Sequence, residues 1–549
     1  MCALTWLVCG ALYLALPPSP DQFNHAYLGW RLLMGDVPYR DTIDMNWPGV
    51  WWLHAMATGI FGVRMWSWRA FDYLLFGITC IFLCDLVRRA AGGRAARICA
   101  VTSPVLYVTS GYWIAGQHDM SAAQFLVAAL WAHVRGHETP AGRWQFLAGA
   151  MLAAAMLNKP TVGIMLPLLV LHALMLGASP RRVVAVAAAT TAGLLATLAA
   201  AAAAAITHGT TARELFDATI VFNAAAQYAG LPDALPRRPR SIGIDFLMFH
   251  GWRWADLALA AVAATIWLAR SANRSAAGTA FGVLWLTGVL SYFVQGRGFS
   301  YHLAPALLAL FGLLPIALDL LSARGAGSGE LGSQDRRNHP PRPLRRKIAL
   351  GILSCALGVL LLNRLHASYG GLPRALWSRD ESFHLERFRA NDGISVAEAV
   401  GLAELARTAA DPDCFLMVGS GSAINYLSER RQPTRFYYFP MIAQSIPPLP
   451  MAANWRALWS ADLRSSDCLH VGVSGEIIER WSSGDEEIAA VLENLLRRYD
   501  LVTRAGDKGS FSLYRRRMRQ APSPAGPENQ YRQDIPSGRN APGQAADRE

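Results

Sequence analysis

The sequence predicts a polytopic α-helical membrane protein with a small extracytoplasmic α/β domain at its carboxyl end. Its 549 residues are 53% hydrophobic and only 16% charged, whereas a soluble protein has about 25% charged residues. Long apolar segments separated by short arginine runs fill residues 1–365. Beyond them, shorter apolar runs alternate between strand-like and helix-like patterns, which is typical of an α/β domain.

Eleven apolar segments are predicted to span a bilayer, since a spanning helix needs about 20 mainly apolar residues. They lie at about residues 3–17, 66–87, 96–114, 120–134, 183–207, 254–270, 277–294, 303–322 and 348–364, with two more inside 144–178 that turn at Asn158, Lys159 and Pro160. Residues 50–63 are too short to span. Because tryptophans flank them, we expect an interfacial helix there.

The charged residues between these spans define an orientation. If the spans alternate, the arginine-rich turns at residues 88–97, 135–143, 181–182, 270–274 and 324–347 share one side. The positive-inside rule places that side in the cytoplasm. The acidic loop at residues 21–49 and the carboxyl terminus then lie outside, and the basic cluster at 237–240 is the exception.

Residues 366–518 form the predicted extracytoplasmic domain. Strands are expected at 414–421, 434–439 and 468–474, an edge strand at 511–517, and helices from 423 and over 486–499. Cys414 and Cys468 could pair if this region faces an oxidising compartment, or remain two buried thiols. The tail, residues 519–549, has the composition of a disordered segment.

The net charge of +12 does not indicate a nucleic-acid partner. The positive charges lie in the turns between spans, and no aromatic-basic motif of a known nucleic-acid reader is present.

Polar candidates for chemistry gather on the loops of one predicted face. They are Asp21, Asp44, Asp119, Lys159, Arg297 and His302, whereas the spans contain few ionisable residues apart from Asp72, Asp85 and Asp256. A transporter more often places such residues in mid-helix around a central site. The pattern therefore favours surface chemistry on a membrane-embedded substrate.

Each candidate also has a structural alternative. Asp21 and Asp119 could cap helices, and Lys159 could be a snorkelling anchor. Asp41 and Asp44 could be solvated loop acids, Arg297 could bind lipid headgroups, and His302 could be structural. Asp36, in Gly-Asp-Val-Pro, is expected to be a turn residue.

Several motifs together resemble a known family. They are Asp-Gln with Tyr27, Leu-Leu-Met-Gly-Asp-Val-Pro-Tyr-Arg-Asp, Asn-Trp-Pro-Gly, Gly-Gln-His-Asp at 116–119, Asn-Lys-Pro-Thr at 158–161 and Gln-Gly-Arg-Gly-Phe-Ser-Tyr-His at 295–302. Residues 1–365 resemble GT-C glycosyltransferases, in the bacterial branch related to dolichyl-phosphate-mannose protein mannosyltransferases and rhizobial lipopolysaccharide-core glycosyltransferases. One departure is that Asp21-Gln22 stands where the family commonly has Asp-Glu.

The resemblance implies an enzyme of the bacterial inner membrane that takes a sugar from a polyprenyl-phosphate donor. A lipid, glycan or protein would accept it on the periplasmic side. Asp21 is the candidate general base, with Asp44 as a second catalytic acid. Asp119, His118 and Asn46 would shape the acceptor site. Arg297 and Lys159, supported by His302, would bind the donor phosphate.

A metal is not required, because phosphate already leaves readily, although a divalent metal at Asp44 or Asp119 stays open. Two other classes of function also stay open at this stage. One is a polytopic transporter or lipid flippase. The other is a membrane scaffold that presents residues 365–518.

Overall fold

A computed structural model describes residues 2–139, 142–224, 275–295, 299–323, 358, 361–390, 393–408, 414–419, 422–437, 450–474, 486–505 and 511–517. Arg297, the span expected at 254–270, the basic linker at 324–347 and the tail at 519–549 lie outside these residues. Residues 1–516 form one compact unit.

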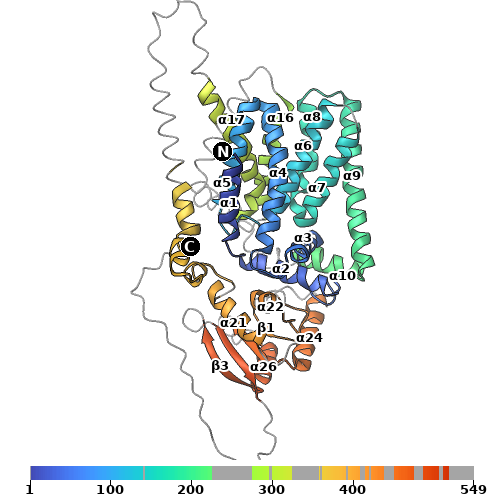
Figure 1. Cartoon of the computed structure of the whole chain (residues 1–549). Helices are drawn as coiled ribbons and strands as arrows, with labels where there is room; N and C mark the ends of the chain where they lie inside the picture. The colour runs from blue at the N-terminus through green and yellow to red at the C-terminus, as the bar shows by residue number, and fades with distance from the viewer. Residues whose placement is uncertain are drawn as a thin grey trace, which may run out of the picture. The chain divides into compact units, whose positions relative to one another are not determined.

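Helices occupy the expected spans that the described residues include up to residue 323, and they run side by side in Figure 1. They are α1 (Cys2–Leu14), α4 (Ser67–Ala91), α5 (Gly93–Val108), α6 (His118–Glu138), α7 (Gly142–Asn158), α8 (Met165–Met175), α9 (Pro180–Thr207), α16 (Ala276–Gln295) and α17 (Ala304–Ala323). Among the described residues, four stretches are long and apolar enough to cross a membrane: α4, α9, α16 and residues Ser300–Asp319. The chain is thus a multi-pass membrane protein, and the count of eleven spans stays a prediction.

Glycines bring α7 and α9 into close contact. A Cβ at Gly149 would lie 1.8 Å from the Thr190 carbonyl oxygen, and one at Gly193 would lie 1.9 Å from that of Phe146. No side chain fits at such distances, so any larger residue would force the two helices apart. This agrees with the role of small residues in packing membrane helices.

Two shorter helices, α2 (Pro20–Leu33) and α3 (Pro48–Phe61), lie across one end of the bundle in Figure 1. Ser19 begins α2 with a capping box, in which its hydroxyl accepts from the Gln22 amide and the Gln22 side chain accepts from the Ser19 amide. The capping box satisfies two backbone donors that a helix start leaves free. The helix α3 covers most of residues 50–63, where an interfacial helix is expected. The prediction that these residues form a helix is therefore confirmed.

The expected turn between α7 and α8 is also confirmed. Lys159 precedes a short 3-10 helix, η1 (Pro160–Ile164), which leads into α8. Further short helices are α10 (Ala212–Phe216), the π-helical η2 (Asp217–Val221) and η4 (Ser300–Leu303). The turn places Lys159 at the same end of the bundle as α2.

The carboxyl-terminal region contains a four-stranded sheet in the order β1-β2-β4-β3. The strands are β1 (Leu416–Val418), β2 (His470–Ser474), β3 (Tyr499–Ala505) and β4 (Phe511–Arg516), and only β1 and β2 pair in parallel. The helices are α19 (Leu372–Ser378), α20 (Ser382–Leu385), α21 (Val396–Thr408), α22 (Ser422–Ser428), α24 (Pro450–Ser465) and α26 (Glu486–Leu496).

Two details of this region differ from the sequence prediction. The strand expected at 434–439 is irregular backbone over its described residues 434–437. These residues bond instead to the first loop, residues 34–47, where the Ile43 amide donates to the Arg435 carbonyl at 2.8 Å. The segment expected as an edge strand, β4, lies inside the sheet because β3 pairs along its other side.

Candidate active site at one end of the bundle

Asp21 lies in the first turn of α2, and its side chain is half-buried. Gln117 Nε2 donates to Asp21 Oδ2 at 3.1 Å and also reaches Ser19 Oγ at 3.3 Å. These two bonds fix the start of α2 against the Gly-Gln-His-Asp loop. Asp21 does not cap the helix, because the capping residue is Ser19.

The next two residues of that loop form a charged cluster with Lys159. Lys159 Nζ lies 3.3 Å from Asp119 Oδ2 and 3.3 Å from His118 Nε2, and His118 Nε2 lies 3.1 Å from Asp119 Oδ2. All three side chains are largely buried. Lys159 therefore does not simply extend toward a membrane surface, since it holds an ion pair inside the protein.

The end of α16 and the short helix η4, which precedes α17, border the same cluster. Gln295, at the end of α16, hydrogen-bonds Asp119, and the charges of Asp21 and His302 act on Asp119 and His118 respectively. His302 is buried in η4. The structure thus brings together Asp21, His118, Asp119, Lys159 and His302, while Arg297 lies outside the described residues.

Asp44 is almost fully buried in the first loop, at 1% exposure. It accepts from the Met45 amide at 2.8 Å and from Asn46 Nδ2 at 3.1 Å, and Tyr437 donates a further hydrogen bond. Burial raises the pKa of Asp44, and these hydrogen bonds act in the opposite direction. Asp44 is therefore not a solvated loop acid.

Asn46 links Asp44 to α2. Its Nδ2 lies 3.3 Å from His25 Nε2, and the His25 ring meets the His118 ring edge to face at 5.3 Å. Burial lowers the pKa of His25 to about 3, and the charge of Lys159 adds to this. A neutral His25 accepts a hydrogen bond from Asn46 through Nε2. His25 therefore contacts both the first loop, through Asn46, and the Lys159 cluster, through His118.

Asp36 proves to be more than a turn residue. It is buried and forms an ion pair with Arg31, and Arg431 approaches it at 3.7 Å. The Thr42 hydroxyl also donates to it at 3.2 Å. Asp36 therefore holds the first loop between α2 and the carboxyl-terminal region, which the Gly-Asp-Val-Pro pattern alone does not reveal.

Gln22 explains why this chain lacks the second acid of the Asp-Glu pair. Its Nε2 donates to the carbonyl oxygens of Ala115 at 3.0 Å and Tyr112 at 3.5 Å. A glutamate in this position would direct a carboxylate at two acceptors, and burying such a charge without donors is costly. The amide is the form that suits this environment.

Metal binding finds no ready site in the described part of the chain, where no three His, Cys, Asp or Glu side chains are grouped to hold an ion.

Three residues of the site were not predicted from the sequence. His25 lies four residues after Asp21, which places both on one helical face, and this spacing could have identified it. Gln295 begins the Gln-Gly-Arg-Gly motif, and its place in that motif could have identified it. Tyr437 had no signal, because its contact with Asp44 joins distant parts of the chain.

Comparisons with known proteins support the predicted fold. A family model described as dolichyl-phosphate-mannose-protein mannosyltransferase matches residues 45–206. ArnT from Cupriavidus metallidurans, bound to undecaprenyl phosphate, has a similar structure, with a TM-score of 0.56 and 16% sequence identity over 96% of this chain and 98% of that chain. ArnT in the apo state gives 0.51 and 15%, over 93% and 96%. No curated protein sequence matches the chain.

The chain shares the fold of ArnT, and part of it resembles the mannosyltransferase family. The predicted fold is thereby confirmed, the family match is consistent with the predicted glycosyltransferase class, and neither comparison supports a transporter or flippase. The residues 45–206 that match the family model include Asn46, His118, Asp119 and Lys159. Asp21 and His302 lie outside the match, and the structure joins them to it.

Proposed function

We propose that the protein transfers a sugar from a polyprenyl-phosphate donor to a lipid, glycan or protein acceptor on the periplasmic face of a bacterial inner membrane. The observation that carries this proposal is the cluster of Asp21, His118, Asp119 and Lys159 from three separate segments. The similar ArnT structure, which is bound to undecaprenyl phosphate, supports a polyprenyl carrier.

Asp21 is the proposed general base. The acceptor hydroxyl must lose a proton as its oxygen attacks the anomeric carbon, and a positioned carboxylate serves this purpose. Asp21 is half-buried, so it remains accessible, and Gln117 fixes its orientation. Asp44 suits a structural role better than base catalysis, because it is buried and accepts several hydrogen bonds.

Lys159 is the proposed contact for the leaving phosphate. As the sugar leaves, negative charge remains on the lipid phosphate, and a nearby cation stabilises that charge. Asp119 holds the Lys159 ammonium in the site before the donor arrives. His302 and Arg297 are proposed to complete the phosphate contacts, and His118, Asp119 and Asn46 to shape the acceptor side.

The disulfide supports the proposed orientation. Cys414 and Cys468 are bonded, with their Cα atoms 5.3 Å apart. Disulfides persist mainly in oxidising compartments such as the periplasm. We therefore propose that the domain at residues 366–518 is periplasmic. The eleven spans and the disordered tail at 519–549 remain part of this proposal on the sequence pattern alone.

The test is transfer by the purified full-length protein in lipid nanodiscs. Undecaprenyl-phosphate-linked hexoses and pentoses would be supplied with envelope lipids and glycans from a deletion strain, and release of undecaprenyl phosphate measured. We expect Asp21→Asn to lower turnover about 10³-fold, within the range for loss of a general base. Asp41→Asn is the matched control, an acid of the same region whose Val37 contact an amide can keep.

Equal loss in both variants, or unchanged transfer in Asp21→Asn, would contradict the assignment of the base. Loss of uptake without any change in envelope glycan would favour transport instead. Mass spectrometry of lipopolysaccharide and glycoproteins from the deletion strain would identify the sugar and the acceptor.

A further inference from the structure

A short segment of the carboxyl-terminal region, residues 430–437, connects the sheet to the active site. We refer to it as the docking segment. On its sheet side, the Phe415 amide donates to the Arg431 carbonyl at 3.0 Å. Gln432 exchanges two hydrogen bonds with the Met417 backbone, at 2.7 and 2.6 Å.

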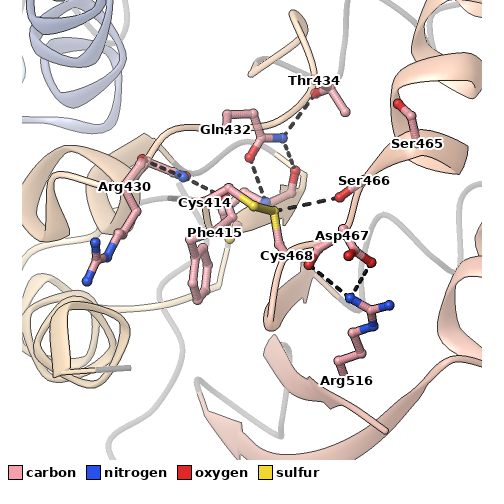
Figure 2. Close-up of a disulfide and its surroundings, with 12 residues drawn as sticks. Cys414, Phe415, Arg430, Gln432, Thr434, Ser465, Ser466, Asp467, Cys468 and Arg516 are labelled. Carbon is pink, nitrogen blue, oxygen red and sulfur yellow. Dashed lines mark hydrogen bonds and ion pairs between the residues drawn. A yellow bond between two sulfur atoms is a disulfide. The ribbon is translucent and has the colours of Figure 1, made fainter. Parts of the chain in front are cut away.

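The disulfide lies directly beside this attachment. Cys414 forms a β-bridge with Arg431, and its sulfur is bonded to Cys468, which precedes β2. Figure 2 shows Gln432 and Thr434 close to the disulfide and bonded to each other. The sheet therefore holds the docking segment through both covalent and hydrogen bonds.

The opposite side of the docking segment contacts α2 and the first loop. The backbone amide of Gln432 donates to the Tyr27 hydroxyl at 2.7 Å, and Arg31 Nη1 donates to the backbone carbonyl of Gln432 at 3.2 Å. Ile43 donates its amide to the Arg435 carbonyl at 2.8 Å. These bonds hold the docking segment against α2 and against Ile43, the residue that precedes Asp44.

Tyr437, at the end of the docking segment, contacts Asp44 in the first loop. It is buried at 3% exposure, and its hydroxyl donates to Asp44. Asp44 holds Asn46, and Asn46 meets His25, whose ring packs on His118. A tyrosine from the carboxyl-terminal region thus completes a chain of contacts that ends at the Lys159 cluster.

We propose that Tyr437 is a positioning residue of the glycosyltransferase site, through which the carboxyl-terminal region holds the first loop in its active arrangement. The inference rests on the proposed function and adds a residue to its site. Tyr437 need not touch either substrate. Its effect passes through Asp44, Asn46 and His25 to the residues that do.

The acid side of the pH profile offers a specific readout. Among the described residues, the titratable groups that face Asp44 are Tyr39, His25 across Asn46, and Tyr437. Tyr39 and Tyr437 are phenols. His25 is neutral above about pH 3, because burial lowers its pKa to about 3. Asp44 is therefore the carboxyl group of this set that governs the acid side of the profile, and burial raises its pKa above the ordinary value.

Tyr437→Phe tests the proposal, and Tyr426→Phe is its matched control. Tyr426 is equally buried, and its hydroxyl meets Thr58 Oγ1 at 3.4 Å, away from Asp44. With the donor that the wild type uses best, we expect Tyr437→Phe to lower turnover about tenfold, the effect of losing one hydrogen bond to a charged group. Tyr426→Phe should stay within twofold of the wild type.

The pH profile separates positioning from a general loss of structure. Loss of a donor raises the pKa of a carboxyl group, so activity that requires ionised Asp44 should fall at a higher pH in Tyr437→Phe. In an Asp44→Asn background, Tyr437→Phe should cause no further loss, because the two residues act through one bond. Hydrogen exchange at residues 43–46 should become faster in Tyr437→Phe only.

An unchanged pH profile together with unchanged exchange at 43–46 would overturn the proposal, as would fully additive effects of the two substitutions. A wild type that releases no undecaprenyl phosphate from any donor would instead contradict the proposed function. The exchange measurement would still decide whether Tyr437 holds the first loop.

Discussion

Asp72 and Asp21 are two carboxylates whose neighbours meet at the same end of the helical bundle, yet their surroundings differ. Asp72 is fully buried and accepts from the hydroxyls of Tyr13 and Tyr107, both at 2.6 Å, and from Gln124 at 3.3 Å. Asp21 is half-buried in the first turn of α2. The difference shows that burial of an acid does not by itself indicate catalysis, because a base must also be reachable.

The same contrast holds for the two cations nearby. Arg69 donates to the carbonyls of Ala115 and Pro17, both at 2.6 Å, and so fixes the backbone that leads to Gln117. In the described part of the chain, the Lys159 ammonium instead contacts the side chains of Asp119 and His118. Moreover, Nδ1 of His118 and Nδ1 of His25 have no hydrogen-bond partner in the described part of the chain.

The largest expected effect that would sharpen this contrast is that of Lys159→Ala. We expect kcat/KM for the donor to fall about 100-fold, because a cation at the leaving phosphate is removed. The fold should survive, and a thermal melt of the nanodisc sample checks this. Lys159→Arg keeps the charge and should recover part of the loss. Equal activity in Lys159→Ala and the wild type would remove Lys159 from the phosphate site.

Asp72→Asn should give the opposite result. An amide group would direct its own donors at hydroxyls that now donate to Asp72, and the expected cost is about 2 kcal/mol in the free energy of unfolding. The activity of each folded molecule should stay close to that of the wild type. Melting temperature and turnover measured on one preparation separate the two effects. A loss of turnover without loss of stability would break the comparison.

Tyr13→Phe is the mildest of these changes. It removes one hydrogen bond to Asp72 and one acceptor of Arg69, which lies 3.0 Å away. We expect a loss of about 1 kcal/mol in stability and unchanged transfer. Denaturation of the purified variant beside Asp72→Asn tests whether the smaller change has the smaller effect. A larger loss than in Asp72→Asn would show that Tyr13 supports Arg69 more than Asp72.

Much of the architecture follows from patterns that act over short distances in the sequence. Apolar length predicted α4, α9, α16 and α17, and the Asn158-Lys159-Pro160 motif predicted the turn before η1. The gathering of Asp21, Asp119 and Lys159 followed from the expected sidedness of their loops. In each case, a local physical cause, such as hydropathy or a proline, determines the outcome.

Other features depend on contacts between distant residues, and no local pattern encodes them. Residues 434–437 have the composition of a strand, yet tertiary bonds to the first loop override that propensity. Asp36 is in a turn motif, but its ion pair with Arg31 depends on how the loop folds back on α2. The role of Tyr437 beside Asp44 is equally invisible to a reading of either segment alone.

The docking segment also limits how the protein can be engineered. A chimera that exchanged the whole carboxyl-terminal region at residue 366 would bring a foreign segment against Tyr27, Arg31 and Asp44. The recipient would then lose the bonds that Gln432, Arg435 and Tyr437 supply. An exchange intended to alter acceptor choice should therefore retain residues 430–437, or transplant them together with the first loop as a matched pair.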